Sequence, residues 1–306
     1  MRIGLCLFFN YPFEKNFPIL RRLYGDYFDE IRFIQPLVET SEKDAFTVYR
    51  AAFNFSGFFS DARQFIKEMN CDVVIFAGDD CIINRDVLGN RFEEVFGVPG
   101  DGFDMFVTKL WPFSANAWWK NMQKLRALGR LFGQGGIFDQ RIQNWKSYFP
   151  QADELALRLE SLGVVNGPID APPSDIVARM PLDQQAVIRG FFQGKGTCDL
   201  PYPLAYGISD FFIVGGHILD EFCHNAGLFA ALNVFSEFST PTALAATQGR
   251  LSQCPDLGLS VDWTYGNNPE KEFFVPQSFS EIDDFLNSMP KRLLYKHPVK
   301  LSTVRD

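Results

Sequence analysis

The most hydrophobic short run of this chain is Cys71-Asp-Val-Val-Ile-Phe-Ala-Gly-Asp-Asp-Cys-Ile-Ile-Asn84. Its β-branched and aromatic residues 73–77 have the length and composition of a buried strand. Gly78 lets the backbone turn and keeps space open beside it. Two adjacent carboxylates, Asp79 and Asp80, therefore follow the C-terminal end of a buried strand, which is where ligands of open α/β sheets usually bind.

Adjacent carboxylates repel each other, and a hard divalent cation relieves that repulsion. Mg²⁺ or Mn²⁺ is usually held by one or two carboxylates, while substrate phosphates supply further ligands. Asp79 and Asp80 therefore indicate a metal and phosphate site. The alternative interpretation is a simple turn in which one aspartate caps the segment that follows.

The first hundred residues alternate between strand and helix patterns. We expect strands at residues 3–9, 31–34 and 71–77, helices at 18–27 and 61–69, and a further short element at 47–54. Such alternation predicts an α/β fold, in which a mostly parallel sheet lies between helices. Phenylalanine is unusually frequent, and its density at Phe53, Phe55, Phe58 and Phe59 indicates that some of these rings are exposed.

A further strand is expected at residues 103–110, after which the pattern changes. Residues 111–200 carry tryptophans, Pro/Gly-rich joints and helical stretches at 116–132 and 152–162, so we expect a mostly helical insertion within one domain of 306 residues. The tryptophans are Trp111, Trp118, Trp119 and Trp145.

Strand character returns at residues 205–214, and a helical stretch follows at 216–235. Thr240, followed by Pro241, has the pattern of a helix start. A late helix is expected at 282–289.

Composition limits the classes of partner. The net charge of −8 and the pI of about 5.0 argue against nucleic acid, since phosphate backbones are bound by clustered basic residues. The first residues are too short for a secretory signal, and no run of 18 apolar residues is present, so we expect no transmembrane segment. The six cysteines match no zinc module and indicate buried free thiols in a reducing compartment. The missing signal leads us to expect a cytoplasmic protein.

Three further polar elements accompany the aspartate pair. Asp210 interrupts an apolar strand, where aspartate needs a hydrogen-bond partner or a ligand. Glu237 lies between Phe235 and Phe238, and apolar surroundings raise the pKa of a carboxylate toward that of a general base. The tail contains His297 and Lys300, which can bind a cation and neutralise phosphates. The alternatives are a strand-edge aspartate, a capping glutamate and a basic coil.

Together these segments resemble the GT-A fold glycosyltransferases, most closely bacterial and viral enzymes that build polysaccharides from nucleotide sugars. The resemblance rests on Phe76-Ala-Gly-Asp-Asp80, Tyr206-Gly-Ile-Ser-Asp-Phe-Phe212, Phe235-Ser-Glu-Phe-Ser-Thr-Pro-Thr242 and His297-Pro-Val-Lys-Leu-Ser302. It covers the whole chain in outline and some thirty residues in detail. The chain has Gly78-Asp79-Asp80 where the family has an Asp-x-Asp motif, so which aspartate binds metal stays open.

The resemblance implies a Rossmann-type sheet and a role for each matched residue. Asp79, Asp80 and His297 would hold Mn²⁺ or Mg²⁺ against the donor diphosphate, with Lys300 as a phosphate contact. The loop after the first strand, including Phe8 and Asn10, would border the nucleotide. Glu237 would deprotonate the acceptor hydroxyl in an inverting transfer, with Asp210 orienting a substrate or serving as the alternative base.

The implied partners are a nucleotide-sugar donor and a glycan or lipid-linked acceptor on the tryptophan-rich side, with peripheral membrane association through exposed aromatic rings. Retaining transfer is also compatible with the sequence. Two other classes stay open. One is a metal-dependent nucleotidyltransferase or phosphohydrolase. The other is a non-catalytic glycan- or nucleotide-binding module in which Asp79, Asp80 and Glu237 are structural caps.

Overall fold

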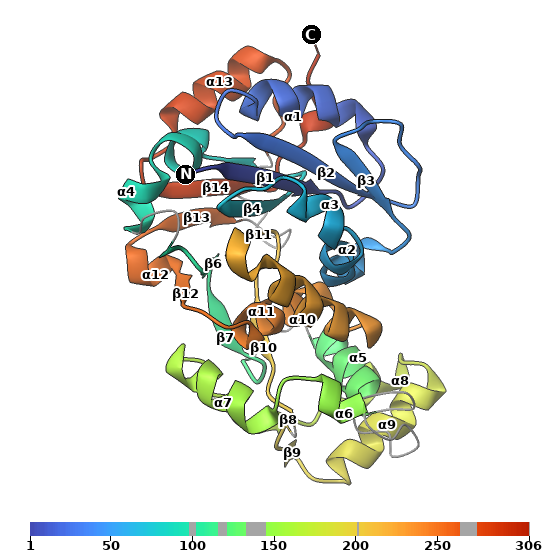
Figure 1. Ribbon diagram of the computed structural model, residues 1–306. Helices are drawn as coiled ribbons and strands as arrows, with labels where there is room; N and C mark the ends of the chain where they lie inside the picture. Colours follow the sequence, from blue (N-terminus) through green and yellow to red (C-terminus); the bar gives the residue numbers. More distant parts are fainter. Residues whose placement is uncertain (98–101, 116–120, 133–144, 201, 264–273, 306) are drawn as a thin grey trace.

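The computed structural model describes residues 1–97, 102–115, 121–132, 145–200, 202–263 and 274–305. A mixed sheet lies at its centre, between two layers of helices (Figure 1). The spatial order of its seven strands is β12 (Leu251–Gln253), β6 (Met105–Val107), β11 (Phe211–Gly215), β4 (Val73–Gly78), β1 (Ile3–Phe8), β2 (Glu30–Pro36) and β3 (Ala45–Val48). All neighbours are parallel except that β11 is antiparallel to β4 and β6. The predicted α/β class with a mostly parallel sheet is confirmed.

Each face of the sheet has its own hydrophobic core, because successive side chains of a strand point to opposite faces. Phe76 and Phe212 belong to one core and Ile75 and Ile213 to the other. The helices that pack on the first face are α2 (Phe55–Asp61), α3 (Arg63–Lys67), α10 (Leu219–Ala231) and α11 (Ser236–Ala246). Those on the second face are α1 (Phe17–Tyr24), the π-helical turn η3 (Asp86–Asn90), α4 (Phe92–Phe96) and α13 (Phe279–Ser288).

A second, three-stranded sheet adjoins the edge where β4 ends. Its order is β13 (Ser260–Trp263), β14 (Leu293–His297) and β5 (Ile82–Ile83), and β14 is antiparallel to β5. The remaining short elements outside the insertion are η1 (Glu14–Asn16), η2 (Ala52–Asn54), η6 (Gly216–Ile218), α12 (Cys254–Leu257) and η7 (Leu301–Thr303). Because β5 begins directly after the aspartate pair, the pairing of β5 with β14 brings the C-terminal part of the chain next to Asp79 and Asp80.

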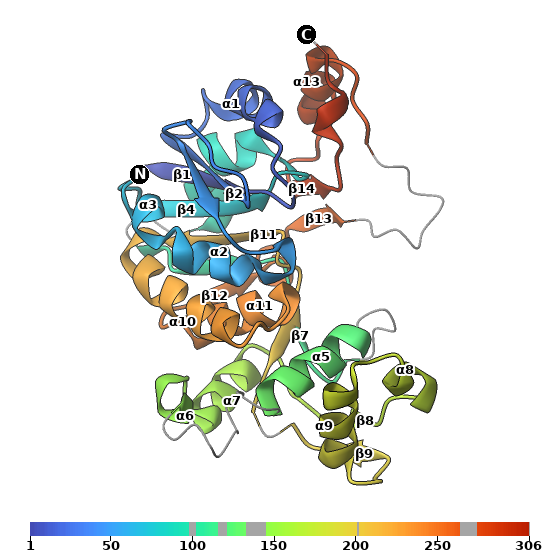
Figure 2. The same ribbon diagram turned by 90° about the vertical axis from the view of Figure 1, so that its right-hand side faces the viewer.

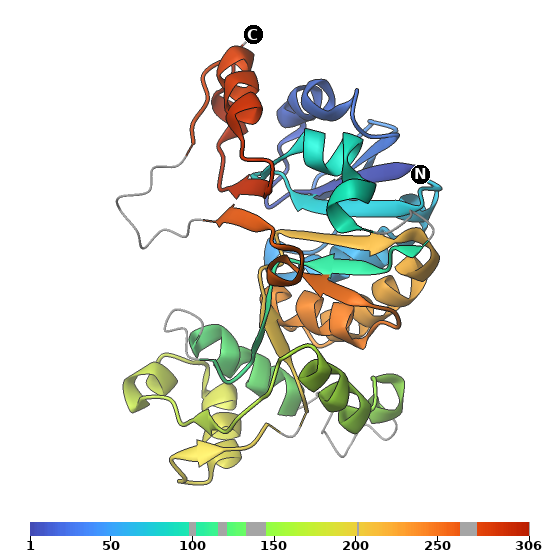
Figure 3. The same ribbon diagram turned by 90° about the vertical axis from the view of Figure 1, so that its left-hand side faces the viewer.

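The segment between β7 (Leu110–Pro112) and β10 (Ala205–Gly207) is mostly helical and lies beyond one face of the central sheet, as Figures 2 and 3 show from two sides. Its elements are α5 (Asn121–Phe132), α6 (Trp145–Tyr148), α7 (Ala152–Ser161), α8 (Ser174–Ala178), α9 (Leu182–Phe192), and the strand pair β8 (Ile169–Asp170) and β9 (Thr197–Cys198). Residues 116–120, with Trp118 and Trp119, lie outside the described residues. Among the described residues, no helix has both the length and the apolar character needed to cross a membrane.

Two of the predicted strands are each divided in the structure. Residues 103–110 contribute β6 to the central sheet and then the start of β7, while residues 205–214 form β10 and then β11. β7 and β10 pair with each other in a separate antiparallel ribbon. The prediction of two continuous strands is wrong because each segment leaves the central sheet partway along its length and then pairs with the other segment. A hydrophobic run in the sequence does not reveal where a strand changes its pairing partner.

The helix predicted to start at Thr240 begins earlier, at Ser236, and contains Pro241. The Ser236 hydroxyl accepts a hydrogen bond from Phe55 N at 2.8 Å and donates one to Phe53 O at 2.9 Å. These contacts fix the first turn against η2 and α2, so tertiary packing overrides the local preference for a start at the Thr-Pro pair. Glu237 is consequently a first-turn residue of α11 rather than a residue preceding a helix.

The helix predicted at residues 61–69 is also different, since two short helices, α2 and α3, cover residues 55–67. α2 begins six residues earlier than predicted because its phenylalanines are core residues: Phe55, Phe58 and Phe59 are buried. Phe53 is 65% exposed, as expected for part of this aromatic cluster.

We predict that Phe76→Ala lowers the free energy of unfolding by about 3–5 kcal/mol, the usual loss for a large buried ring. The Phe76 ring is fully buried and stacks on Phe212 with centroids 4.7 Å apart. Urea denaturation measures the change, and Leu182→Ala is the control because Leu182 is 82% exposed. A loss below about 1 kcal/mol for Phe76→Ala would contradict the packing described here.

Candidate functional site

The candidate site lies at the edge of the central sheet where β1, β4 and β6 end and the antiparallel strand β11 begins. Two backbone hydrogen bonds fix the chain here. Gly78 N donates to Asp210 O at 2.8 Å, and Asp79 N donates to Phe8 O at 3.0 Å. The structure therefore brings the predicted residues of three separate segments to one edge, which is the usual position of a ligand site in an open α/β sheet.

Gly78 lies where a side chain would crowd the Asp80 carboxylate. A Cβ atom built on it would lie 2.9 Å from Asp80 Oδ1 and 3.8 Å from Asp210 O. The missing side chain thus allows the Asp80 carboxylate to approach the end of β4, which agrees with the role expected for this glycine.

Asp79 is 7% exposed, and its Oδ1 accepts a long hydrogen bond, 3.4 Å, from Asn10 N. Burial, and then the negative charge of Asp80, raise the pKa of Asp79 to about 8, while the Asn10 N–H and His297 act in the opposite direction. A buried carboxylate next to a second carboxylate is a group that gains from a nearby cation.

Asp80 faces His297, although the two residues are 217 positions apart in the chain. His297 Nε2 lies 3.3 Å from Asp80 Oδ2, and Val299 N donates to Asp80 O at 2.7 Å. The pairing of β14 with β5, with Lys296 opposite Ile82, produces this contact. It was predicted only through the family resemblance.

The His297 imidazole is 9% exposed and stacks on Trp263 with ring centroids 5.9 Å apart. Its Nδ1 atom is buried and has no hydrogen-bond partner among the described residues. Burial lowers the pKa of His297, but Asp80, Asp210 and Glu237 raise it by a larger total, so the pKa stands above its ordinary value. This one imidazole therefore sits in the field of three carboxylates.

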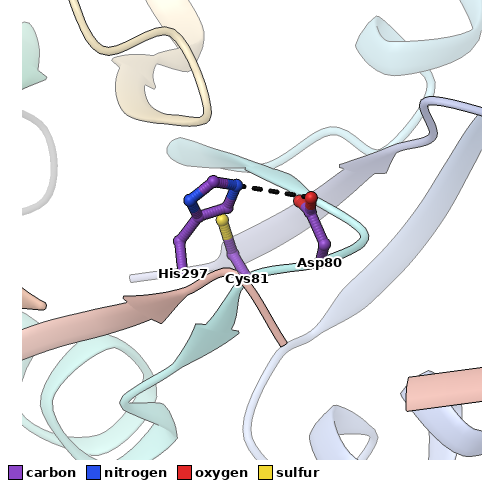
Figure 4. Close-up of side chains that lie close together, drawn as sticks. All are labelled: Asp80, Cys81 and His297. Carbon is purple, nitrogen blue, oxygen red and sulfur yellow. Dashed lines mark ion pairs between the residues drawn. The ribbon is translucent and has the colours of Figure 1, made fainter. Parts of the chain in front are cut away.

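Asp80, Cys81 and His297 form a cluster whose ligand atoms all lie within 4.8 Å of one another (Figure 4). Cys81 was not among the predicted site residues, and its only sequence signal is its position beside Asp80. Its Sγ lies 3.6 Å from Asp210 O, and burial raises the pKa of the thiol well above its usual value. A protonated thiol is a poor ligand for a hard cation.

The Asp80 and His297 side chains fit a cation by geometry. Two ligand atoms 3.3 Å apart, each about 2.1 Å from a shared ion, subtend an angle of about 100° at that ion. Asp79 does not belong to this three-residue cluster, so Asp80 rather than Asp79 is the carboxylate that could share an ion with His297.

Asp210 is half-buried at the start of β11, and its Oδ2 accepts a hydrogen bond from Trp263 Nε1 at 3.1 Å. Glu237, 8% exposed in the first turn of α11, lies close enough to raise the pKa of His297. Both predicted catalytic carboxylates thus lie within electrostatic reach of the cluster, one from the sheet and one from a helix.

The predicted nucleotide and phosphate contacts differ in accessibility. The Phe8 side chain is fully buried against Phe55 and Phe59, so only its backbone can border a ligand. Asn10 is half-buried, and its N–H is directed to Asp79. The Lys300 side chain is exposed, three residues beyond His297.

A scan against protein-family models gives no match for this chain, and a search of the curated proteins gives none. The function is therefore inferred from the chemistry of the site rather than from relatives, and a fold alone does not specify an activity.

The raised pKa of Asp79 predicts a pH-dependent stability of the metal-free protein. The folded state keeps a proton on Asp79 that the unfolded state has already released, so stability decreases as pH rises from about 4, the ordinary aspartate range, to about 8. The contribution of this group is at most about 1.4 kcal/mol per pH unit. His297 acts in the same direction, since its raised pKa favours folding at low pH.

Denaturation in EDTA at a series of pH values measures this slope in the wild type and in Asp79→Asn. We expect the variant to lose part of the slope and to be the more stable protein at pH 8. Parallel pH profiles for the two proteins would show that Asp79 ionises normally in the folded state.

Proposed function

We propose that this protein is a glycosyltransferase that moves a sugar from a nucleoside diphosphate donor to a glycan or lipid-linked acceptor, with Mn²⁺ or Mg²⁺ at the site. The observation that carries the proposal is the meeting of Asp80, after β4, with His297, from β14. The GT-A resemblance gives both residues a metal-binding role. The mostly parallel sheet and the position of the site at its carboxyl edge support the proposal.

The donor would bind with its diphosphate toward Asp79, Asp80 and His297. The bound cation would neutralise the negative charge that develops on the leaving diphosphate. Lys300 is exposed on the segment after His297, and it would contact the same phosphates. Asn10, beside the end of β1, would border the nucleotide. Such donors are cytoplasmic metabolites, so the proposal places the protein in the cytoplasm.

Glu237 would accept the proton of the attacking acceptor hydroxyl in an inverting transfer. A glutamate that is 8% exposed in the first turn of a helix is held in one place and is shielded from bulk water. A correctly placed general base typically contributes about 10²–10⁴-fold in rate. Asp210, oriented by the Trp263 indole, would position a substrate and is the alternative base.

We predict that a donor stabilises the protein only when metal is present. Thermal unfolding is measured with UDP-, GDP-, dTDP- and CMP-sugars, each with Mn²⁺ and with EDTA. One donor should raise the melting temperature with Mn²⁺, since a ligand at a hundred times its Kd contributes about 2.7 kcal/mol. Asp80→Asn should remove this shift, whereas Asp26→Asn, a change at an exposed aspartate, should retain it.

Wild-type protein that binds no donor, or Asp80→Asn that binds the donor as tightly as the wild type with Mn²⁺, would contradict the metal-site assignment. Free hydrolysis of the donor to a nucleoside monophosphate and a sugar phosphate without an acceptor would instead favour the hydrolase class.

We predict that Glu237→Gln lowers kcat by about 10²–10⁴-fold and leaves the metal-dependent donor shift unchanged, because the base acts on the acceptor. Release of nucleoside diphosphate in the presence of a mixture of simple sugars measures turnover. Glu68→Gln, at an exposed glutamate, is the matched control. A wild type that binds the donor but shows no turnover beyond that of Glu237→Gln would favour a binding module.

A further inference from the structure

A cavity of about 350 Å³ lies where the helical insertion faces the start of α11. Its polar and aromatic lining residues come from four separate segments, η2, α5, α9 and the loop between α10 and α11: Phe53, Arg126, Arg130, Gln184, Asn233 and Phe235. Figure 2 shows α5 and α9 on the far side of α11 from the central sheet. This cavity is separate from the cluster around Asp80, and its volume is in the range of sites for small ligands.

The charged residues that line this cavity are positive, whereas the chain as a whole is negative. Arg126 and Arg130 are four residues apart on α5 and therefore lie on the same face of the helix. No aspartate or glutamate lines the cavity among the described residues, although the chain as a whole has a net charge of −8. Guanidinium groups bind carboxylates and phosphates through paired hydrogen bonds, so the lining favours an anionic ligand.

Aromatic rings and amides complete the lining. The Phe53 and Phe235 rings lie 5.7 Å apart at an angle of 44°, and Phe53 is 65% exposed. Flat apolar faces of this kind pack well on the C–H faces of a sugar ring. Gln184 Oε1 is buried and lacks a hydrogen-bond partner within the described part of the chain, which leaves one acceptor for a hydroxyl group.

Asn233 adds a hydrogen-bond donor to the lining. It adopts a left-handed backbone conformation, with φ of 54°, and its Oδ1 accepts a hydrogen bond of 3.4 Å from Asn54 Nδ2. Because its oxygen is engaged by Asn54, the Asn233 side-chain nitrogen is the atom available to donate to a ligand.

We propose that this cavity binds an anionic sugar unit, with its carboxylate or phosphate on Arg130 and its ring against Phe53. An arginine, two aromatic faces and two amides in about 350 Å³ match a single charged sugar better than a long peptide or a nucleic acid. The site itself does not depend on the proposed activity.

A second part of the inference rests on the proposed function: the bound unit belongs to the acceptor. Phe235 caps α11 and is two residues before Glu237, the candidate base. A glycan longer than the bound unit would have to extend past the start of α11 to bring a hydroxyl to Glu237. The acceptor would then be an acidic polysaccharide or a phosphorylated glycan.

Binding of simple probes to the full chain tests the proposal. Ligand-observed NMR titrations use glucuronate, glucose 1-phosphate, glucose and inorganic phosphate, without donor or metal. We expect at least one of the two anionic sugars to bind more tightly than both glucose and phosphate alone. Preference between the two sugars identifies the anion as carboxylate or phosphate.

Three variants locate the binding. Arg130→Gln should weaken it by about tenfold or more, since a hydrogen bond to a charged group contributes roughly 1.5–3 kcal/mol. Phe53→Ala should also weaken it, and this change is compatible with folding because the ring is mostly exposed and the Phe53 carbonyl that accepts from Ser236 is retained. Arg189→Gln, at an exposed arginine of α9 outside the cavity, should bind like the wild type.

Equal binding of glucose and the anionic sugars, equal binding of inorganic phosphate, or unchanged binding in Arg130→Gln would each overturn the proposal. The donor-dependent thermal shift is measured on the same variants and separates the two ideas. Absence of anionic sugar binding by the wild type, with an intact donor shift, refutes only the cavity assignment. Anionic sugar binding without any donor shift refutes only the transferase proposal and leaves the cavity as a glycan-binding site.

Discussion

The strand β11 enters the central sheet between β4 and β6 and runs against both of them. This arrangement places the start of β11 beside the end of β4, so Asp210 and the aspartate pair share one edge although about 130 residues separate them. The hydrogen bond from Gly78 N to Asp210 O fixes the two segments at this point. Without the antiparallel strand, Asp210 would lie at the opposite edge of the sheet, and the site would lose one of its carboxylates.

A second antiparallel pairing adds the histidine to this edge. β5 follows the aspartate pair closely in the chain and pairs with β14, which ends at His297. The imidazole thereby becomes the one cationic partner that the described structure places against Asp80. The same pairing places the imidazole in the field of Asp80, Asp210 and Glu237, and these carboxylates raise its pKa. Asp79 has a raised pKa of its own because it is buried beside Asp80.

The sequence predicted the parts of this site that depend on local patterns. The β-branched run before Gly78 gave the buried strand, and the aspartates at its end followed from that. The local patterns did not predict that Cys81 joins Asp80 and His297 in one cluster. That cluster depends on the pairing of β14 with β5, and pairing between strands far apart in the chain leaves no local signal. The start of α11 was missed for a related reason, since Ser236 is chosen by its contacts with Phe53 and Phe55 rather than by the residues beside it.

The two divided strands connect the site to the cavity at the start of α11. The segments that form β6 and β11 both leave the central sheet and meet again as β7 and β10. Gly207 makes the crossing possible, because a Cβ atom there would lie 2.9 Å from Lys109 O and 3.1 Å from Pro241 of α11. The ribbon thus packs on the helix that carries Glu237 and also leads into the helical insertion. Because β10 leads into Asp210 and β11, the ribbon joins the insertion, the helix that carries Glu237 and the carboxylate at the sheet edge.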